Sequence, residues 1–169
     1  MNEILKTCNL LNNEFSFWFH NPNDTNWSIE SYHEILHFTT IEEFWVLINN
    51  INNYLIENGM FFIMKEGIMP IWEDEKNING GCVSLRIPKI GCKDLWVKFL
   101  ASFISNNLDD KINGISISPK KNFNIIKLWY SCEVNQEEII LPEELNESKE
   151  KLLYRSHKYN IEKDKQRNN

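Results

Sequence analysis

The order of the apolar segments limits the fold most, because short strand-like runs alternate with amphipathic helical patterns. The aromatic run Phe15–His20 and the run Ser31–Phe38 flank a loop rich in Asn, Asp and Pro, as two strands of a sheet would. Four more runs have the length and composition of strands. These runs are Met60–Met64, Cys82–Ile87, Gly114–Ser118 and Asn124–Cys132, the last two joined by the turn Pro119-Lys120-Lys121-Asn122.

Three segments have helical signals. Thr40-Ile41-Glu42-Glu43 has the pattern of a capping box, and apolar residues then recur every three to four positions, which predicts a helix over 40–54. A second apolar stripe predicts a helix over 94–106. Pro142, followed by two glutamates, predicts the start of a third helix over 142–153.

The order of these segments indicates an α+β fold. Hairpin strands come first, helices stand between later strands, and no glycine-rich phosphate loop occurs, which favours an antiparallel sheet with helices on one face. The other face is then free for a ligand. We expect a single domain over residues 1–159 and a disordered charged tail over 160–169.

Charge and cysteine usage exclude several functions. The net charge of −6 disfavours a protein that coats RNA through its backbone, so any nucleotide should bind in a local pocket. The four cysteines have no metal-ligand spacing and no signal-like segment precedes them, which predicts free thiols in a reducing compartment. We expect no metal, no cofactor and no membrane association.

The pair Trp72-Glu73 is the strongest candidate for a ligand site. An indole can stack on a nucleobase while the adjacent carboxylate hydrogen-bonds the edge of the same base. Trp27 lies in a second polar connection. From the residues alone, Trp72-Glu73 could also be a packed indole beside solvated charges, and Trp27 either anchors its loop or forms a platform.

Several motifs stand at characteristic spacings along the chain. They are Phe17-Trp18-Phe19, the loop that ends at Trp27, Phe38-Thr39-Thr40-Ile41-Glu42-Glu43-Phe44-Trp45, residues 65–77 including Trp72-Glu73-Asp74-Glu75-Lys76-Asn77, Gly80-Gly81, and Leu128-Trp129. From about residue 10 to 133, these motifs resemble the cap-binding eukaryotic translation initiation factor 4E family in both identity and spacing. A later segment, Tyr154-Arg155-Ser156-His157, also resembles the family.

The resemblance implies a curved antiparallel β-sheet backed by three helices on its convex face, with the messenger RNA cap on the concave face. Trp27 and Trp72 would sandwich the 7-methylguanine, whose positive charge strengthens stacking on indoles by about 2 kcal/mol when it is desolvated. Glu73 would accept hydrogen bonds from the guanine edge. Trp129 would touch the methyl group.

The resemblance also places cations near the cap triphosphate. Lys120 matches a family phosphate-binding position, Lys127 could replace the cation lost at Ile125, and His157 matches a loop near the phosphates. Cys82 departs from the family pattern, which has an arginine at this position.

A partner surface is implied on the convex face, where a helix of a scaffold initiation factor or repressor would bind. Lys98 stands where the family usually has Glu, which leaves an altered partner as an alternative. The matching positions are Leu11, Ile41, Trp45, Val97 and Ala101.

These implications give a cytoplasmic, noncatalytic protein, monomeric before it meets its partner, that recruits capped messenger RNA in translation initiation. A cap-sequestering repressor or viral variant is the alternative. A less favoured reading is a cap-hydrolysing enzyme that holds magnesium on Glu73-Asp74-Glu75, although no second acidic motif accompanies this cluster.

Overall fold

A computed structural model of the chain describes residues 8–143, 145–146 and 151–167. Its centre is one seven-stranded sheet in which every neighbouring pair of strands is antiparallel, in the order β2-β1-β3-β5-β6-β4-β7. The strands are β1 (Leu10–His20), β2 (Tyr32–Thr40), β3 (Met60–Lys65), β4 (Gly81–Pro88), β5 (Ile112–Pro119), β6 (Phe123–Tyr130) and β7 (Leu152–Ser156).

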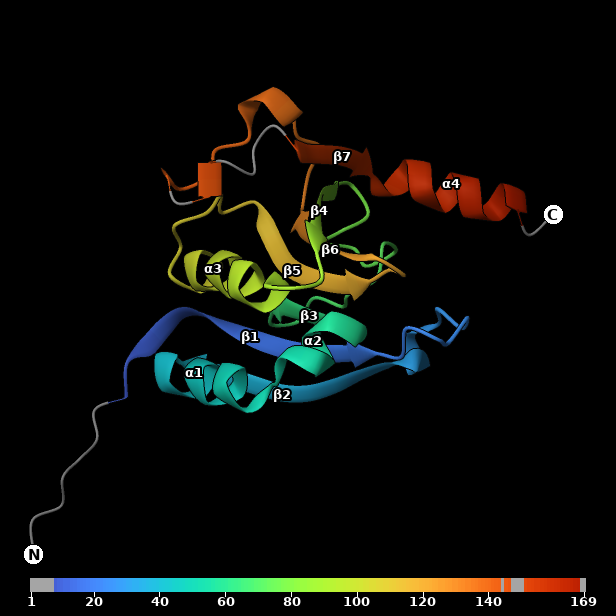
Figure 1. Cartoon of the computed structure of the whole chain (residues 1–169). Coiled ribbons are helices and arrows are strands. Elements are labelled where there is room, and N and C mark those ends of the chain that lie inside the picture. Colours follow the sequence, from blue (N-terminus) through green and yellow to red (C-terminus); the bar gives the residue numbers. More distant parts are fainter. Residues whose placement is uncertain (1–7, 144, 147–150, 168–169) are drawn as a thin grey trace, which may run out of the picture.

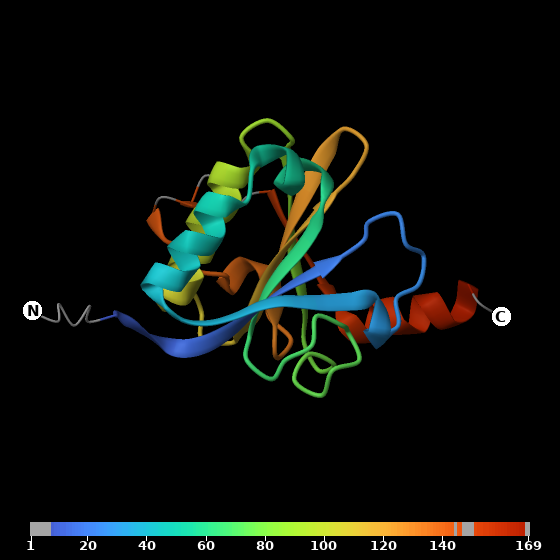
Figure 2. The same cartoon turned by 90° about the horizontal axis from the view of Figure 1, so that it is seen from below.

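Three helices cover the convex face of this curved sheet, as Figures 1 and 2 show. They are α1 (Ile41–Asn50), α2 (Asn53–Asn58) and α3 (Cys92–Ile104). The main core lies between them and the sheet, where Phe44, Trp96 and Phe99 pack against strand residues such as Phe15. The α+β fold that the sequence predicts is therefore confirmed.

Local sequence explains how the first helix begins and ends. Thr40 and Glu43 form the predicted capping box, with the Glu43 amide donating to Thr40 Oγ1 and the Glu43 carboxylate accepting from the Thr40 amide. The helix ends at Asn50, before the predicted boundary at 54. Asn52 accepts a hydrogen bond from the Leu55 amide and so caps the separate short helix α2.

The structure differs from the sequence predictions after residue 141. The sequence predicts a helix over 142–153, but its last two residues belong to the strand β7. Residues 144 and 147–150 lie outside the described residues. The strand forms because Leu152 and Tyr154 pack on the core while it pairs with β4. Short 3-10 turns at Ile29–Ser31 (η1) and Gln136–Glu138 (η2) lie in the described connections.

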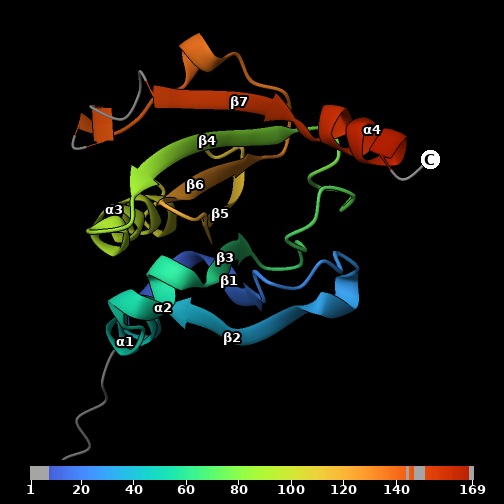
Figure 3. The same ribbon diagram turned by 45° about the vertical axis from the view of Figure 1, so that its right-hand side comes forward.

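The predicted disordered tail is also wrong for most of its length, because α4 (His157–Arg167) continues directly from β7. Its Lys, Glu, Gln and Arg residues have good helix propensity even though few of them are buried. Figure 3 shows α4 beyond the end of β7, at the end of the sheet where the loop 21–31 and the loop after β3 also lie. In the described parts of the chain, no helix has the length and apolarity needed to span a membrane.

Candidate functional site

A cavity of about 530 Å³ opens at the end of the sheet where these loops meet α4. Trp27, Trp72, Glu73 and Trp129 all line it, although they come from three separate segments of the chain. Lys120 and Lys127 line it as well. Six of the seven ligand-site residues that the sequence predicts are therefore gathered around one space. Further lining side chains are Pro22, Tyr32, Met60, Phe62, Pro70, Ile71, Ser118, Pro119 and Asp164.

Trp27 is held by a stack that the sequence did not reveal. Its ring lies parallel to that of His20, with the centroids 4.3 Å apart and the planes 2° apart. His20 is fully buried, and its Nε2 lies 2.9 Å from the Asn26 carbonyl oxygen. Because a carbonyl oxygen only accepts, Nε2 carries the hydrogen, and this bond ties the imidazole to the residue before Trp27. Trp27 itself is 54% exposed.

Trp72 and Glu73 are positioned by the backbone of their own loop. The Asp74 carboxylate accepts from the Met69 amide at 2.9 Å and from the Lys76 amide at 2.8 Å. The buried Asn77 amide donates to the carbonyls of Met69 and Ile71, at 2.9 and 3.0 Å. The side chains of Asp74 and Asn77 thus close the loop on both sides of Trp72.

These bonds also bear on the acidic cluster Glu73-Asp74-Glu75, the magnesium site that the cap-hydrolysing alternative requires. Both carboxylate oxygens of Asp74 accept backbone hydrogen bonds, which leaves Asp74 with a structural task in the loop. The part of the chain that the structure describes contains no group of three or more His, Cys, Asp or Glu side chains placed to hold a metal ion.

Trp129 forms the floor of the cavity. It is 3% exposed, and its Nε1–H donates to Ser116 Oγ at 3.0 Å, so only a small part of the indole can meet a ligand. Phe62 packs edge-on against it. Tyr32 lies beside them, and burial, followed by the negative charge of Glu73, raises the pKa of its phenol. Tyr32 therefore remains a neutral hydrogen-bonding group at the base of the cavity.

His157, the seventh predicted residue, does not reach the cavity. Its ring is fully buried and packs on Trp129 with a centroid separation of 5.2 Å. Burial and the nearby Lys127 ammonium lower the pKa of His157 to about 4, so the ring is neutral at physiological pH. A buried neutral imidazole supplies no charge for phosphate, so the structure does not bring His157 together with the other six predicted residues.

Lys127 pairs with Ser84, two residues along β4 from Cys82, where the family pattern has a cation. Burial raises the pKa of the Cys82 thiol to about 12, and the positive charge of Lys127 opposes this shift. Cys82 therefore stays an uncharged thiol packed on the cavity floor. Lys120 is exposed on the turn between β5 and β6.

The glycine pair before β4 allows the strands beneath the cavity to close up. A Cβ at Gly80 would lie 1.8 Å from the Tyr130 carbonyl oxygen, and one at Gly81 would lie 2.4 Å from the Arg155 carbonyl oxygen. Any side chain at these positions would separate β4 from its neighbours. The Gly80 carbonyl also accepts a hydrogen bond from the His157 amide at 2.9 Å.

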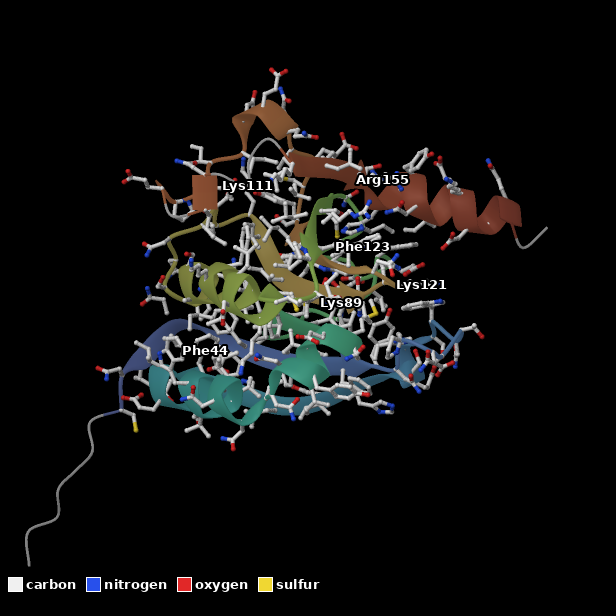
Figure 4. The ribbon with its side chains drawn as sticks, in the orientation of Figure 1. Phe44, Lys89, Lys111, Lys121, Phe123 and Arg155 are labelled. Carbon is white, nitrogen blue, oxygen red and sulfur yellow. The ribbon has the colours of Figure 1, made fainter. Side chains whose placement is uncertain are left out.

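The predicted partner residues lie on the convex side, away from the cavity. Ile41 and Trp45 on α1 are 39% and 41% exposed. Leu11 on β1, with Val97 and Ala101 on α3, is half-buried at the edge of the core. Phe44, which Figure 4 labels on α1, is fully buried, whereas the next residue, Trp45, is exposed.

Comparisons with known proteins agree with this arrangement. The family model described as eukaryotic initiation factor 4E matches residues 10–169. Eukaryotic translation initiation factor 4E-3 of Arabidopsis thaliana is 30% identical over 142 residues, covering 79% of this chain and 59% of the plant protein. Eukaryotic translation initiation factor 4E of Saccharomyces cerevisiae is 30% identical over 133 residues, covering 73% and 62%. The matches thus span about three fifths of the length of these relatives.

Solved structures share the fold. The eIF4E-3 of Ascaris suum in complex with the m7G cap superposes with a TM-score of 0.75 at 22% identity, covering 89% of this chain and 92% of the other. The eIF4E-3 of C. elegans in complex with the 4E-binding protein Mextli gives a TM-score of 0.73 at 20% identity, covering 91% and 96%.

Proposed function

Because this chain belongs to the eukaryotic initiation factor 4E family, we propose that it binds the 7-methylguanosine cap of messenger RNA in the cavity between Trp27 and Trp72. The observation that carries the proposal is the shared cavity. Two indoles, one exposed carboxylate and a buried indole floor, from three separate segments, line the same 530 Å³ space. This set of groups matches the chemistry of a charged purine that has a hydrogen-bonding edge.

Each part of the ligand has a complementary group in this chain. The cationic 7-methylguanine ring would stack on Trp27 and Trp72, an interaction worth about 2 kcal/mol when it is desolvated. Glu73 would accept from the N1–H and the exocyclic amine of the guanine, which adenine cannot offer in the same arrangement. Trp129 would contact the methyl group from below.

The triphosphate would be held by Lys120 and Lys127, the two lysines that line the cavity. Cys82 and Ile125, which replace family cations, contribute no charge. With so few cations involved, the affinity should depend only weakly on salt, in contrast to proteins that bind along an RNA backbone.

We propose that the protein acts in translation initiation, as a noncatalytic cytoplasmic factor that recruits capped messenger RNA through a scaffold partner. Residues 1–159 would act as one cap-binding domain, monomeric until the partner binds. The partner surface would be formed by Leu11, Ile41, Trp45, Val97 and Ala101. The half-exposed Ile41 and Trp45 support this, as does the solved complex of C. elegans eIF4E-3 with the 4E-binding protein Mextli.

The cap proposal is tested with Glu73→Gln, which keeps the size of the side chain and removes its charge. Loss of charge-assisted hydrogen bonds worth about 1.5 to 3 kcal/mol should weaken the binding of 7-methyl-GTP by about tenfold or more. Calorimetric titration measures this change, and Glu75→Gln, an exposed neighbour on the same loop, is the matched control. If Glu73→Gln binds 7-methyl-GTP as tightly as the wild type, the assignment of Glu73 fails.

A cap-sequestering repressor is the second candidate, and Lys98 is the observation that favours it. This lysine is exposed on α3 next to Val97, where it changes the charge of the partner surface. Such a protein would bind the cap without engaging the scaffold factor.

Affinity purification from a eukaryotic translation extract separates these two candidates. We expect the wild type and Tyr54→Ala, an exposed aromatic on α2, to recover the scaffold initiation factor. Trp45→Ala should lose most of it, because a half-exposed indole at an interface is a typical hot spot. If the wild type retains the cap but never the scaffold factor, the repressor candidate is favoured.

A further inference from the structure

The concave face of the sheet continues past the cavity over β4, β6 and β7, where the described strand residues on this face include cations and no carboxylates. Directly paired residues of antiparallel strands point to the same face, and Cys82 packs with Trp129 on the cavity floor. The face can therefore be followed along the described strands by alternation. Its residues are Cys82, Ser84, Arg86 and Pro88 on β4, Phe123, Ile125, Lys127 and Trp129 on β6, and Leu153 and Arg155 on β7.

Arg86 and Phe123 form a stacked pair on this surface. The Arg86 guanidinium carbon lies 3.7 Å from the centroid of the Phe123 ring. Phe123 is half-buried, whereas Arg86 is exposed, so the ring supports one side of the guanidinium and the other side faces solvent. A guanidinium held in this way offers a flat cationic surface, and its N–H groups stay free to donate at the edge.

The pair is continuous with the cavity. The Phe123 carbonyl accepts a hydrogen bond at 2.8 Å from the amide of Lys120, which lines the cavity. Lys127, another lining residue, lies on the same face of β6, two residues before Trp129. It is four residues from Phe123, which corresponds to about 13 Å at the usual rise of a strand. Figure 4 shows Lys121 and Phe123 at the β5–β6 turn and Arg155 on β7, which pairs with the other side of β4.

We infer that the Arg86–Phe123 pair receives the first transcribed nucleotide of a capped RNA. The triphosphate would leave the cavity past Lys127 and Lys120, and the next base would stack on the outer side of the Arg86 guanidinium. Bases stack on guanidinium planes as well as on aromatic rings, and the free N–H groups of arginine suit a phosphate. This inference rests on the proposed cap binding and extends it to the RNA body.

The test compares 7-methyl-GTP with a capped five-nucleotide RNA, using the full-length chain and its variants. Arg86→Ala should weaken the binding of the capped RNA by about five- to tenfold, in the range found for stacking of single bases. It should change the affinity for 7-methyl-GTP by less than about twofold. Arg86→Lys keeps the positive charge but loses the planar guanidinium. Relative to Arg86→Ala, it should therefore recover less than half of the lost affinity for the capped RNA. Phe123→Leu should also weaken the binding of the capped RNA, because the Arg86 guanidinium loses the ring on which it stacks.

Lys111→Ala is the matched control, because Lys111 is an exposed cation just before β5 and far from its turn. It should leave both ligands unchanged. Thermal unfolding of each variant shows whether the fold is intact. If Phe123→Leu is destabilised, Arg86→Lys still tests the subsite, because it leaves the Phe123 ring in place.

The outcomes separate this inference from the proposed function. If the wild type binds 7-methyl-GTP but Arg86→Ala leaves the capped RNA unchanged, the nucleotide subsite is overturned and cap binding stands. An equal loss for both ligands would place Arg86 at the triphosphate and would also overturn the subsite. If 7-methyl-GTP does not bind at all, the proposed function fails and the subsite with it.

Discussion

At the scale of single residues, the two candidate platform indoles are ordered by different means. Trp27 is stacked on the buried ring of His20, whereas Trp72 depends on the hydrogen bonds of Asp74 and Asn77. In both cases the indole is placed before any ligand arrives. Such preorganisation lowers the entropy cost of binding, so neighbours that never touch the ligand contribute to its affinity.

His20 can be tested as such a neighbour. His20→Ala should weaken the binding of 7-methyl-GTP by about three- to tenfold, because Trp27 would lose a stacking partner worth about 0.5 to 1.5 kcal/mol. His20→Phe keeps a flat ring and should recover most of the affinity. Fluorescence titration measures both variants, and equal binding by His20→Ala and the wild type would show that Trp27 needs no support.

The sequence located the cavity residues better than their supports. Trp72 and Glu73 were recognisable because an indole and a carboxylate stand together in a polar connection. His20 had no such signal, because its contact with Trp27 depends on how the intervening loop folds back. The burial of His157 was not predictable for a related reason, since sequence similarity transfers a position but not the depth of burial.

At the scale of elements, the loop after β3 shows how a connection without regular structure can hold a site. Asn77 is fully buried, donates to two carbonyls of this loop, and accepts from Asn113 at the start of β5 at 2.9 Å. The loop is thereby attached to the sheet, and Trp72 lies at a fixed place on a rigid scaffold.

Asn77→Ala should therefore affect both stability and binding. The carbonyls of Met69 and Ile71 would lose their donor, so we expect a loss of about 1 to 3 kcal/mol in the free energy of unfolding. The affinity for 7-methyl-GTP should fall as well. Asn79→Ala, an exposed site on the same loop, should change neither quantity. Chemical denaturation measures the stability and calorimetry measures the affinity. If Asn77→Ala matched the wild type in both quantities, this role of Asn77 would be refuted.

The sequence predicted the helices and strands that have a strong periodic pattern of apolar residues. It did not predict the elements whose formation depends on contacts with distant segments or on a local cap. The first helix and the six longer strands have clear patterns and appear in the structure, with boundary shifts of a few residues. β7 is five residues long and exists because it pairs with β4. α2 required the cap that Asn52 provides, and α4 has too few buried residues to show an apolar stripe.

At the scale of the whole molecule, one buried imidazole links the end of the chain to the sheet. His157 joins β7 to α4 and packs under the cavity floor on Trp129. Its pKa is lowered to about 4 in the folded protein, below the usual value of about 6.5 in an unfolded chain. The unfolded chain therefore binds the proton more readily, and stability falls as the pH drops from about 6.5 to about 4.

This linkage predicts a measurable pH dependence. The wild type should lose up to about 3 kcal/mol of unfolding free energy over that pH range. His157→Gln should show a flatter profile, while His33→Gln, an exposed site on β2, should follow the wild type. Denaturant unfolding at a series of pH values measures the slopes. Equal slopes for His157→Gln and the wild type would contradict the assignment.

The sheet brings together a loop near residue 27, a loop near residue 72, a turn at residue 120 and the strand that carries Trp129. No short window of sequence contains this arrangement, and only the antiparallel order of the strands places the four segments at one end. The central claim is that they form one binding site for a methylated guanine.

The most direct test is a tryptophan-fluorescence titration of the full chain with 7-methyl-GTP and with GTP, at two salt concentrations. We predict strong quenching by 7-methyl-GTP, at least about tenfold weaker binding of GTP, and a shallow dependence on salt. Equal responses to the two nucleotides, or no response to either, would contradict the account.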